Sequence, residues 1–566
     1  MEKASLEHYT ESIYSHPISD DEIELRLRTK KDDDITKVEL VYNDKYKFTK
    51  GVKTIEIKEK ISDDTHTYYI QRMKLGDKRF AYVFKIYSAN GESYYFSESG
   101  LTKDYDITQG IYDFFQVPYV NCDDYIHVLP KFQNRVFYQI FVDRFCKDPE
   151  NNNPRINIRW GDTVNTKTIA GGTLKGITSK LDYLKDLGIN ALYLTPIFRA
   201  NSNHKYDTID YYKVDDDFGN ETDLKELIDE CHKRDILILL DGVFNHVSRD
   251  HEFFKDVIKN GKNSKYFDYF YVHGDQVDLK NRNYETFAYA PYLPRLNINN
   301  KEVQKYILSV ASYYVKNFGI DGFRLDVADE IPHFFWVQFR KLLLDINPEF
   351  IILGENWHNA QSFLNSGTEF HSIMNYSIMK NVLNYVAWNK YSAEDFKNEV
   401  VENLMRYKTN VNFNLMNMIS SHDVARFFTE CQENEDKFLL GYAFIFTHIG
   451  IPCVYYGDEI ALPGENDPLC RACFNWDKAN ENSKVFAMIK KLIHIHREHK
   501  INEKDYHIEA LHDLVFISRS NESGTIKLYL NASTKDIPLS HKGNILISNH
   551  YENNILKANG FVMTEE

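Results

Sequence analysis

From residue 136 onward, short buried strands alternate with amphipathic helices, and this alternation restricts the possible folds more than any other feature of the sequence. Strand-like apolar runs occupy 136–142, 190–196 and 236–241. Between them, apolar residues recur at helical spacing in 174–187 and again in 224–231. Repeated strand–helix units build parallel sheets. Their continuation to the strand that ends near residue 458 predicts an α/β chain with a (β/α)8 TIM barrel.

The segments before and after the barrel, and one segment within it, follow other patterns. Residues 1–122 alternate with period two between clusters of Asp, Asn and Gly, which predicts an N-terminal β-sandwich. Residues 246–299, after the third barrel strand, are too long for a simple loop, so we expect a small inserted domain over the barrel mouth. Residues 505–566 return to strands and predict a C-terminal antiparallel β domain. The catalytic barrel with its insert would then span 123–504.

Composition excludes several classes of partner and location. The net charge of −15 argues against nucleic acid and against anionic membranes. The 7 cysteines show no disulfide spacing, and the first residues contain no apolar signal segment, so we expect a cytoplasmic protein. The longest apolar run, 438–456, is interrupted by Gly, His and Pro, and it predicts a buried helix followed by a strand rather than a membrane span.

Polar side chains follow four of the expected barrel strands, at the point where each strand ends. The endings are 241–246, Arg324 with Asp326, 355–358 and 420–426. A structural ion pair or a helix cap would explain any one of them, but four on one rim indicate an active site, because clustered carboxylates raise one another's pKa. Cleavage of a glycosidic acetal needs one protonated acid and one carboxylate facing the anomeric carbon. The sequence therefore predicts a glycoside hydrolase.

Several motifs carry a resemblance to the α-amylase superfamily. The chain contains, in this order, DGVFNH, GFRLDVADE, GENWH and SSHDVAR, which resemble the four signature regions of that superfamily. It also contains HKYDTIDY, YETFAYAP, LPRLN and NDPLCRACFNWD, which resemble motifs of the neopullulanase, cyclomaltodextrinase and maltogenic amylase group. The resemblance covers residues 130–500, and the N-terminal part is similar to the starch-binding-like module of the group.

The resemblance implies roles for individual residues. Asp326 matches the nucleophile, Glu355 the general acid/base and Asp423 the transition-state stabiliser. Arg324 matches the residue that orients the nucleophile, and Asp241 and Asn245 match positions that support the site. The other matches to substrate-binding positions are Tyr206, His246, His422, Glu330, Trp357, Asp467 and Arg471.

The resemblance also implies an activity and an assembly. The expected activity is that of a retaining α-glucan hydrolase, which acts through a covalent glucosyl-Asp intermediate. Such an enzyme would cleave α-1,4-glucosidic bonds, with α-1,6 bonds as a further class. Its substrates would be cyclodextrins, maltooligosaccharides and pullulan. An oligosaccharide α-glucosidase or a transglycosylase of the same superfamily is the alternative. A non-catalytic sugar-binding homologue would be expected to lack one of the three carboxylates, and all three are present. The N-terminal domain would mediate a homodimer.

The sequence departs from the resemblance at a calcium site near the first barrel strand. The loop 146–153 is rich in Asn and Asp, but Thr173 stands where the group has a carboxylate. Because calcium prefers several oxygen ligands, some of them charged, we expect that no cofactor is required. The residues that could still hold a weak calcium site are Asp148, Asn151 and Asn152.

Overall fold

The computed structural model describes residues 1–121 and 125–566, which form two compact units. The first unit joins Met1–Val128 to Leu364–Gly367 and Glu394–Phe413. The second unit holds Leu129–Phe363, Thr368–Ala393 and Asn414–Glu566. The boundary expected between residues 122 and 123 lies outside the described residues.

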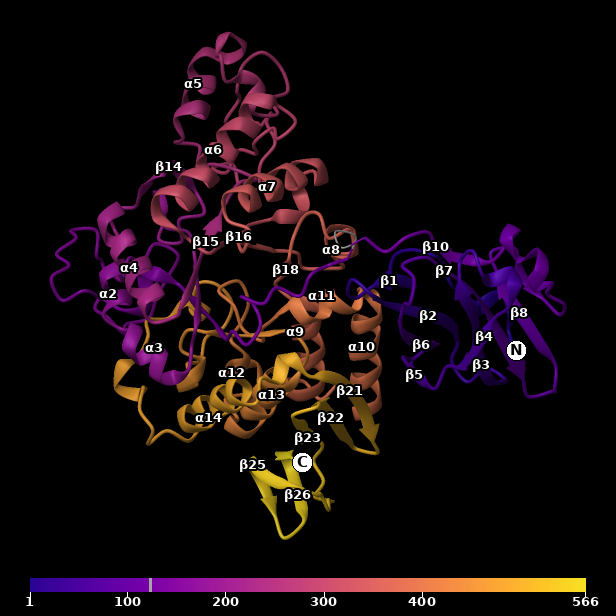
Figure 1. The fold of residues 1–566 in the computed structure, drawn as a ribbon. Coiled ribbons are helices and arrows are strands. Elements are labelled where there is room, and N and C mark those ends of the chain that lie inside the picture. The colour runs from indigo at the N-terminus through magenta and orange to yellow at the C-terminus, as the bar shows by residue number, and fades with distance from the viewer. Residues whose placement is uncertain (122–124) are drawn as a thin grey trace. The chain divides into compact units, whose positions relative to one another are not determined.

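The second unit is built on an eight-stranded parallel sheet (Figure 1). In order of pairing, its strands are β18 (Ser372–Ile373), β17 (Ile351–Gly354), β16 (Gly322–Leu325), β15 (Leu237–Gly242), β12 (Ala191–Leu194), β11 (Phe137–Ile140), β20 (Ile451–Tyr455) and β19 (Met416–Asn417). A parallel bridge between Met374 and Met416 joins the two ends of the sheet. The predicted (β/α)8 barrel is therefore confirmed.

The barrel strands are short apolar runs because both faces of the sheet are covered. Every residue of β12 and of β15 is buried, as expected for parallel strands with side chains inside and helices outside. Tyr193, Leu239, Leu353 and Cys453 pack together in the cluster that fills the barrel interior. Most of the charged residues of these strands lie at or just after the strand ends, where they can reach a ligand.

Helices separate the strands and cover the barrel (Figure 1). They are α1 (Val142–Phe145), α2 (Leu174–Thr178), α3 (Leu181–Leu187), α4 (Glu221–Lys233), α6 (Lys301–Phe318), α7 (His333–Ile346), α8 (Gln361–Leu364), α9 (Tyr376–Val382), α12 (Phe427–Glu430), α13 (Glu435–Thr447) and α14 (Lys484–Glu498). The one helix expected over 174–187 is two helices, interrupted at Ser179 and Lys180. It ends where predicted, because Gly188 takes the left-handed conformation, with φ 100°, that closes α3.

The segment expected as an insert follows β15. It contains α5 (Glu252–Asn260) and the short 3-10 turns η4 (Gly261–Asn263) and η5 (Phe267–Tyr269). Isolated bridges join His246 to Arg295 and Phe270 to Leu296, so the beginning and the middle of the segment pair with its end. Earlier in the chain, the connection that follows β12 forms a hairpin of β13 (Phe198–Ala200) and β14 (Thr208–Val214).

The first unit contains the predicted β-sandwich. One sheet pairs β1 (Ser15–Pro17), β2 (Glu22–Lys30), β6 (His66–Lys74) and β5 (Glu59–Ser62). The other pairs β4 (Lys53–Glu56), β3 (Ile35–Asp44), β7 (Phe80–Ser88), β8 (Ser93–Ser97) and β9 (Gly100–Thr102), and β10 (Phe115–Val117) joins it beside β7. Leu25, Leu27, Leu40 and Phe84 are buried in the core that both sheets share.

Part of the barrel sequence belongs to this first unit. Helix α10 (Ala393–Arg406) and most of α11 (Thr409–Asn414) come from the connection between β18 and β19. Arg26 of β2 donates to the Tyr407 carbonyl at 2.9 Å and to Thr409 Oγ1 at 2.9 Å. Lys397 of α10 donates to the Ser62 carbonyl at 3.1 Å. The sandwich and this connection therefore fold as one body.

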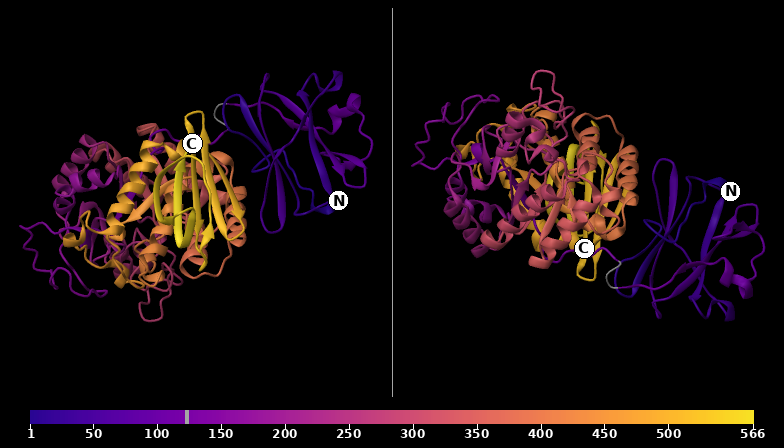
Figure 2. Two further views of the ribbon diagram at one scale, coloured as in Figure 1. Left: turned by 90° about the horizontal axis from the view of Figure 1, so that it is seen from below. Right: turned by 90° about the horizontal axis from the view of Figure 1, so that it is seen from above.

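The chain ends in an antiparallel sheet that packs on α13 (Figure 2). Its strands are β21 (Asp505–Leu511), β22 (Leu514–Asn521), β23 (Gly524–Asn531), β24 (Ile537–Pro538), β25 (Asn544–Glu552) and β26 (Ile555–Glu565). The predicted C-terminal antiparallel sheet is confirmed. Among the described residues, no helix combines the length and the apolar character needed to span a bilayer.

Candidate active site

Three neighbouring barrel strands deliver the charged residues to one rim. Asp241 is near the end of β15 and pairs in register with Arg324 of β16, so the two side chains are neighbours. Asp326 follows β16, and its amide donates to the Gly242 carbonyl at 3.1 Å. Glu355 follows β17, and its amide donates to the Leu325 carbonyl at 2.9 Å. These continued ladder bonds hold both carboxylates at the carboxyl ends of the strands.

Arg324 is the centre of the site. Its guanidinium is fully buried, and Nη1 lies 2.8 Å from Asp326 Oδ1 and 3.0 Å from Asp241 Oδ2. Nη2 lies 2.9 Å from Glu355 Oε1. One cation is thus shared by three carboxylates, two of which belong to the residues predicted as nucleophile and acid/base.

Glu355 is oriented by two further donors. The Trp357 indole donates to Oε1 at 3.0 Å, and the Val327 amide donates to Oε2 at 2.9 Å. Val327 takes the left-handed backbone conformation, with φ 47°, which is strained for a β-branched residue. Trp357 stacks on Tyr376 with ring centroids 4.3 Å apart.

Asp423 approaches from the opposite side of the rim, six residues after β19. His422 Nε2 lies 3.2 Å from its Oδ2, and Arg471 Nη2 lies 3.4 Å from its Oδ1. Arg471 also pairs with Asp467 at 2.9 Å and donates to the His422 carbonyl at 2.7 Å. Asp467 and Arg471, both predicted as substrate-binding residues, are therefore linked directly to the third carboxylate.

The hydrogen bonds of His422 define which ring nitrogen carries the proton. The Gln139 amide group lies 2.6 Å from His422 Nδ1 and donates to it, so the proton sits on Nε2, which faces Asp423 and the hydroxyl of Tyr206. Burial lowers the pKa of His422 well below its ordinary value, so the ring is neutral. The Tyr206 hydroxyl accepts from Nε2 and donates to Asp241 Oδ2 at 3.0 Å.

The two ring nitrogens of His246 are available to bind a ligand. The ring is buried and stacks on Phe287, with centroids 4.9 Å apart. Neither ring nitrogen has a hydrogen-bond partner among the described residues. Burial lowers the pKa of His246 to about 3, so the imidazole is neutral and offers one donor and one acceptor. That pair of groups suits a sugar hydroxyl.

Most of the predicted site residues line one cavity of about 490 Å³. Those on its wall are Tyr206, His246, Asp326, Glu330, Glu355, Trp357, Asp423, Asp467 and Arg471. Arg324, Asp241, His422 and Asn245 are not on the wall but are buried in contact with residues that are. Asn245, for example, donates to Glu330 Oε2 at 3.3 Å. The insert closes the cavity with Phe287, Tyr292 and Leu293.

Burial and mutual repulsion raise the pKa values of the clustered acids. The pKa of Asp423 rises to about 7 and that of Asp241 to about 6, in both cases chiefly because of burial, although the Arg324 charge opposes the rise. Burial and the Glu355 and Asp241 charges also raise the pKa of Asp326, against the effect of Arg324. Asp241, Asp326 and Asp423 therefore each hold a proton more tightly than an ordinary aspartate, and these interacting acids titrate together. The site can supply an acid and a carboxylate together, as acetal cleavage requires.

Sequence reasoning missed several residues of the site. Gln139 fixes the tautomer of His422, Tyr193 donates to Asp241 at 2.7 Å, Tyr376 supports Trp357, and Phe287 supports His246. Gln139 could have been recognised from the sequence, because it is a polar residue inside an otherwise apolar strand. Tyr376 and Phe287 gave none, because the chain has 39 Tyr and 37 Phe residues.

The loop 146–153, which stands where the resembled group has a calcium site, offers few oxygen ligands for that ion. Asn151 turns its amide nitrogen toward the Gly171 carbonyl and donates at 3.0 Å, while its oxygen accepts from the Asn153 amide. Thr173 uses its hydroxyl to cap α2, and Asn152 is exposed. Calcium takes six to eight oxygen ligands, several of them charged. In the described part of the chain, no group of three His, Cys, Asp or Glu side chains is placed to hold a metal.

Comparison with known proteins gives matches over both units. The family model described as "Alpha amylase, catalytic domain" matches residues 139–519, and "Alpha amylase, N-terminal ig-like domain" matches residues 1–121. A cyclomaltodextrinase of Thermoanaerobacter pseudethanolicus is 39% identical over 88% of this chain and 87% of its own length. Neopullulanase 2 of Thermoactinomyces vulgaris is 36% identical over 93% of this chain and 90% of its own. A solved cyclomaltodextrinase structure superimposes with a TM-score of 0.90 at 32% identity, covering 100% of this chain and 98% of that one.

Proposed function

Because this chain belongs to the α-amylase family of glycoside hydrolases, we propose that it hydrolyses α-1,4-glucosidic bonds in cyclodextrins, maltooligosaccharides and pullulan, with α-1,6 bonds as a second class. The relatives named cyclomaltodextrinase and neopullulanase support this choice of substrates. The observation that carries the proposal is the arrangement at Arg324, where Asp326 and Glu355 each contact a different nitrogen of one guanidinium.

The first chemical step forms a covalent intermediate. Asp326 attacks the anomeric carbon, while Glu355 gives its proton to the glycosidic oxygen, so the C–O bond to the leaving sugar breaks as the bond to Asp326 forms. Arg324, 2.8 Å from Asp326, favours the ionised form of this carboxylate against the effect of burial. Asp423, His422 and His246 would hold the hydroxyls of the same ring and favour its distorted, positively charged transition state.

The second step returns the enzyme to its starting state. Glu355, now ionised, takes a proton from water, and the resulting nucleophile displaces Asp326 from the anomeric carbon with net retention of configuration. Retaining enzymes place the two carboxyl groups about 5–5.5 Å apart, whereas inverting enzymes need about 6.5–9.5 Å to admit a water molecule. The shared contact with a single guanidinium supports the closer arrangement.

One experiment tests both the assignment and the stereochemistry. Wild-type protein is given β-cyclodextrin, and proton NMR follows the first anomer of maltose or maltooligosaccharide to appear. We expect the α-anomer first and no detectable turnover by Glu355→Gln. Wild-type turnover by Glu355→Gln, or initial release of the β-anomer, would overturn the mechanism. Initial rates on β-cyclodextrin, pullulan and soluble starch then rank the substrates.

We also propose that the protein forms a homodimer through its N-terminal unit. In that unit, η2 (Phe48–Lys50) and η3 (Ile107–Tyr112) pack on each other. Tyr46, Ile111 and Tyr112 lie beside or within these turns and are exposed by 68%, 59% and 84%. A cluster of large exposed apolar side chains is typical of an interaction surface. Light scattering should give twice the chain mass, and Tyr112→Ser with Ile111→Ser should reduce it to the monomer.

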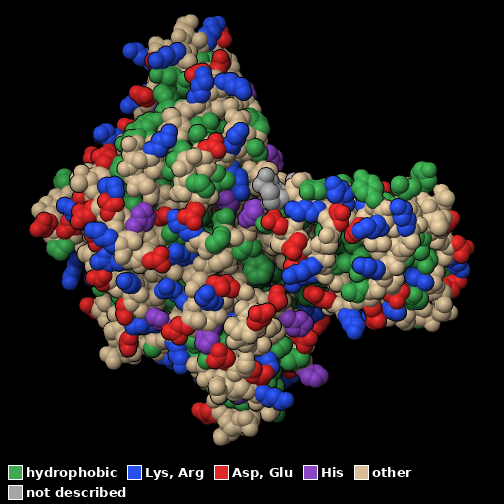
Figure 3. Space-filling view, in the orientation of Figure 1, with side chains coloured by type: hydrophobic (Ala, Val, Ile, Leu, Met, Phe, Trp, Pro, Cys, Tyr) green, Lys and Arg blue, Asp and Glu red, His purple; other side chains and the backbone are tan. Residues whose placement is uncertain are grey.

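For cofactors and location, we propose that no metal is required and that the protein is cytoplasmic. Activity should survive dialysis against EDTA, since the loop of Asp148 and Asn151 lacks a calcium ligand set. The six cysteines in the described residues are all free and buried, which suits a reducing compartment. The face seen in Figure 3 carries interspersed acidic and basic side chains, and the net charge of −15 disfavours polyanionic partners.

A further inference from the structure

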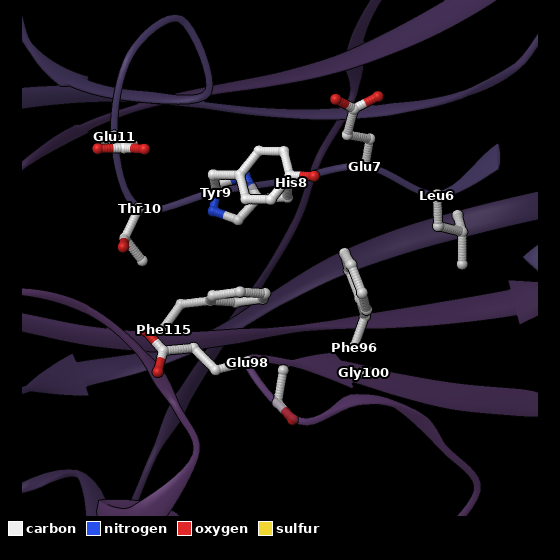
Figure 4. Close-up of a pocket in the computed structure, with 11 residues that line it drawn as sticks. Leu6, Glu7, His8, Tyr9, Thr10, Glu11, Phe96, Glu98, Gly100 and Phe115 are labelled. Atoms are coloured by element: carbon white, nitrogen blue, oxygen red, sulfur yellow. The ribbon is translucent and has the colours of Figure 1, made fainter. Parts of the chain in front are cut away.

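A second pocket lies in the N-terminal unit, away from any residue assigned above. It has a volume of about 400 Å³ and is lined by the segment 6–11, by Phe96, Ser97, Glu98 and Gly100 at the turn between β8 and β9, and by Phe115 of β10. Figure 4 shows the rings of Tyr9, Phe96 and Phe115 around one space. Phe96 and Phe115 meet edge to face with centroids 5.5 Å apart, and Tyr9 is 56% exposed.

The pocket carries negative charge that the described residues do not neutralise. Three carboxylates line it, of Glu7, Glu11 and Glu98. Glu7 is paired with Arg28, whereas Glu11 and Glu98 form no ion pair with any described residue. Both are exposed, so they lie at the edge of the pocket rather than in its floor.

One residue that lines the pocket carries a hydroxyl without a hydrogen-bond partner among the described residues. Ser97 is only 2% exposed, and its Oγ has no hydrogen-bond partner among the described residues. A buried hydroxyl without a partner costs free energy, which makes it a candidate contact for a ligand. His8 is not available, because its Nδ1 and Nε2 contact the Arg26 carbonyl at 2.8 Å and the Tyr82 hydroxyl at 2.9 Å.

The lining distinguishes between classes of ligand. Among the described residues that line the pocket, none is Lys, Arg, Asn, Gln or Trp, so its side chains present carboxylates, hydroxyls and rings but few donors. A neutral sugar needs donors as well as acceptors for its hydroxyls. An ammonium group brings three donors of its own, is attracted by carboxylates, and is stabilised over aromatic faces.

We propose that this pocket binds a primary alkylammonium group on an apolar chain, the chemistry shared by aliphatic diamines and by a lysine side chain. The methylene chain packs between the rings of Tyr9, Phe96 and Phe115. The ammonium group donates to Ser97 Oγ and lies near Glu98 and Glu11.

The test uses the full-length protein and saturation-transfer NMR with 1,5-diaminopentane as the probe. Its uncharged match is 1,5-pentanediol, and maltose represents the sugars. We expect saturable binding of the diamine alone, and weaker binding in about 0.5 M NaCl, which screens exposed charges. Glu98→Gln and Glu11→Gln should each weaken it by about twofold to fivefold, and Ser97→Ala should weaken it as well. Nα-acetyl-lysine methylamide, used as a second probe, determines whether a peptide lysine is also accepted.

Two controls separate this pocket from the rest of the molecule. Glu56→Gln removes an exposed glutamate of the same unit outside the pocket, and Glu330→Gln removes one from the catalytic cavity; neither should change diamine binding. The diamine should also leave β-cyclodextrin hydrolysis unchanged. Equal binding of diol and diamine, binding of maltose alone, or a Glu98→Gln protein with unaltered affinity would each overturn the proposal. These outcomes do not depend on the proposed hydrolytic function.

Discussion

Each unit contains a buried cluster of arginines and carboxylates. In the first unit the arginines outnumber the carboxylate, whereas in the second the carboxylates outnumber the arginines. In the sandwich, Glu24 lies 2.7 Å from Arg26 and 2.8 Å from Arg72, and Thr409 donates to it at 2.8 Å. Burial would raise the pKa of Glu24, but the two guanidinium groups hold it well below its ordinary value. At the barrel rim, Arg324 is shared by three carboxylates, Arg471 contacts a fourth, that of Asp423, and the pKa of Asp423 still rises to about 7.

The difference indicates what each cluster is for. An acid with two cationic partners stays ionised except in strong acid, and its ion pairs contribute to the stability of the fold. Acids that outnumber their cation hold a mobile proton, which costs stability and enables acid catalysis. Substitutions that change the number of acids or arginines should therefore have different effects in the two clusters.

The largest effect is expected on catalysis. Asp326→Asn removes the nucleophile and Glu355→Gln the acid/base, so each should reduce kcat/KM on β-cyclodextrin by about 10⁴-fold or more. Steady-state assays at matched concentrations of folded protein give the ratio. Glu24→Gln is the matched control, since it also neutralises a buried carboxylate, and it should retain kcat per folded molecule within about twofold. An inactive but folded Glu24→Gln protein would contradict the division between the two clusters.

The next largest effect is on the stability of the sandwich. Glu24→Gln leaves Arg26 buried without its counter-charge, and loss of one partner of a buried pair costs about 3 kcal/mol. Chemical denaturation monitored by circular dichroism should show the corresponding fall in the free energy of unfolding. Because the folded pKa of Glu24 is depressed, its contribution is present above the ordinary pKa of a glutamate and is lost only in acid. The cost should therefore be the same at pH 5 and at pH 8.

Asp423→Asn should change stability in the opposite direction, while it abolishes most activity. The folded pKa of Asp423 is raised, so the folded state binds the extra proton between about pH 4 and 7, and stability falls as the pH rises through that window. Removing the carboxyl group should stabilise the protein by about 1 kcal/mol at pH 8 and by little at pH 5. Thermal unfolding at the two pH values measures this. A gain that does not depend on pH would mean that packing rather than charge is responsible.

The smallest effect tests the second arginine of the sandwich. Arg72 is partly exposed, and Arg72→Met leaves Glu24 paired with Arg26, so the loss should be below about 1 kcal/mol. Denaturation in low and high salt measures it, and the difference from wild type should shrink in high salt. A loss as large as that of Glu24→Gln would show that Arg72 rather than Arg26 is the main partner.

Much of the fold was predictable because the spacing of apolar residues along the sequence indicates each strand and helix. The barrel strands are buried on both faces, so most of them appear as apolar runs, and the polar residues that end them stand out. The rim residues Asp241, Arg324, Asp326 and Glu355 were predictable for this reason. The family motifs then supplied Tyr206, Asp467 and Arg471, which no local pattern distinguishes.

Features that depend on distant contacts were not predictable. The break at Ser179 and Lys180 leaves the apolar spacing of 174–187 intact, so periodicity does not reveal it. The contact of Gln139 with His422 joins residues separated by 283 positions. The strained turn at Val327 depends on the hydrogen bond that its amide donates to Glu355.

The fusion of α10 and its flanking residues with the sandwich limits how this protein can be shortened. A chain beginning at residue 129 would still encode every barrel strand, but the Tyr407 carbonyl, Thr409 and Lys397 would lose Arg26 and Ser62 as partners. Such a truncation exposes a surface that is normally covered, and we expect it to be insoluble. Engineers who want a minimal catalyst would have to redesign the β18–β19 connection, and a swap of the N-terminal module between relatives would have to carry residues 394–413 with it.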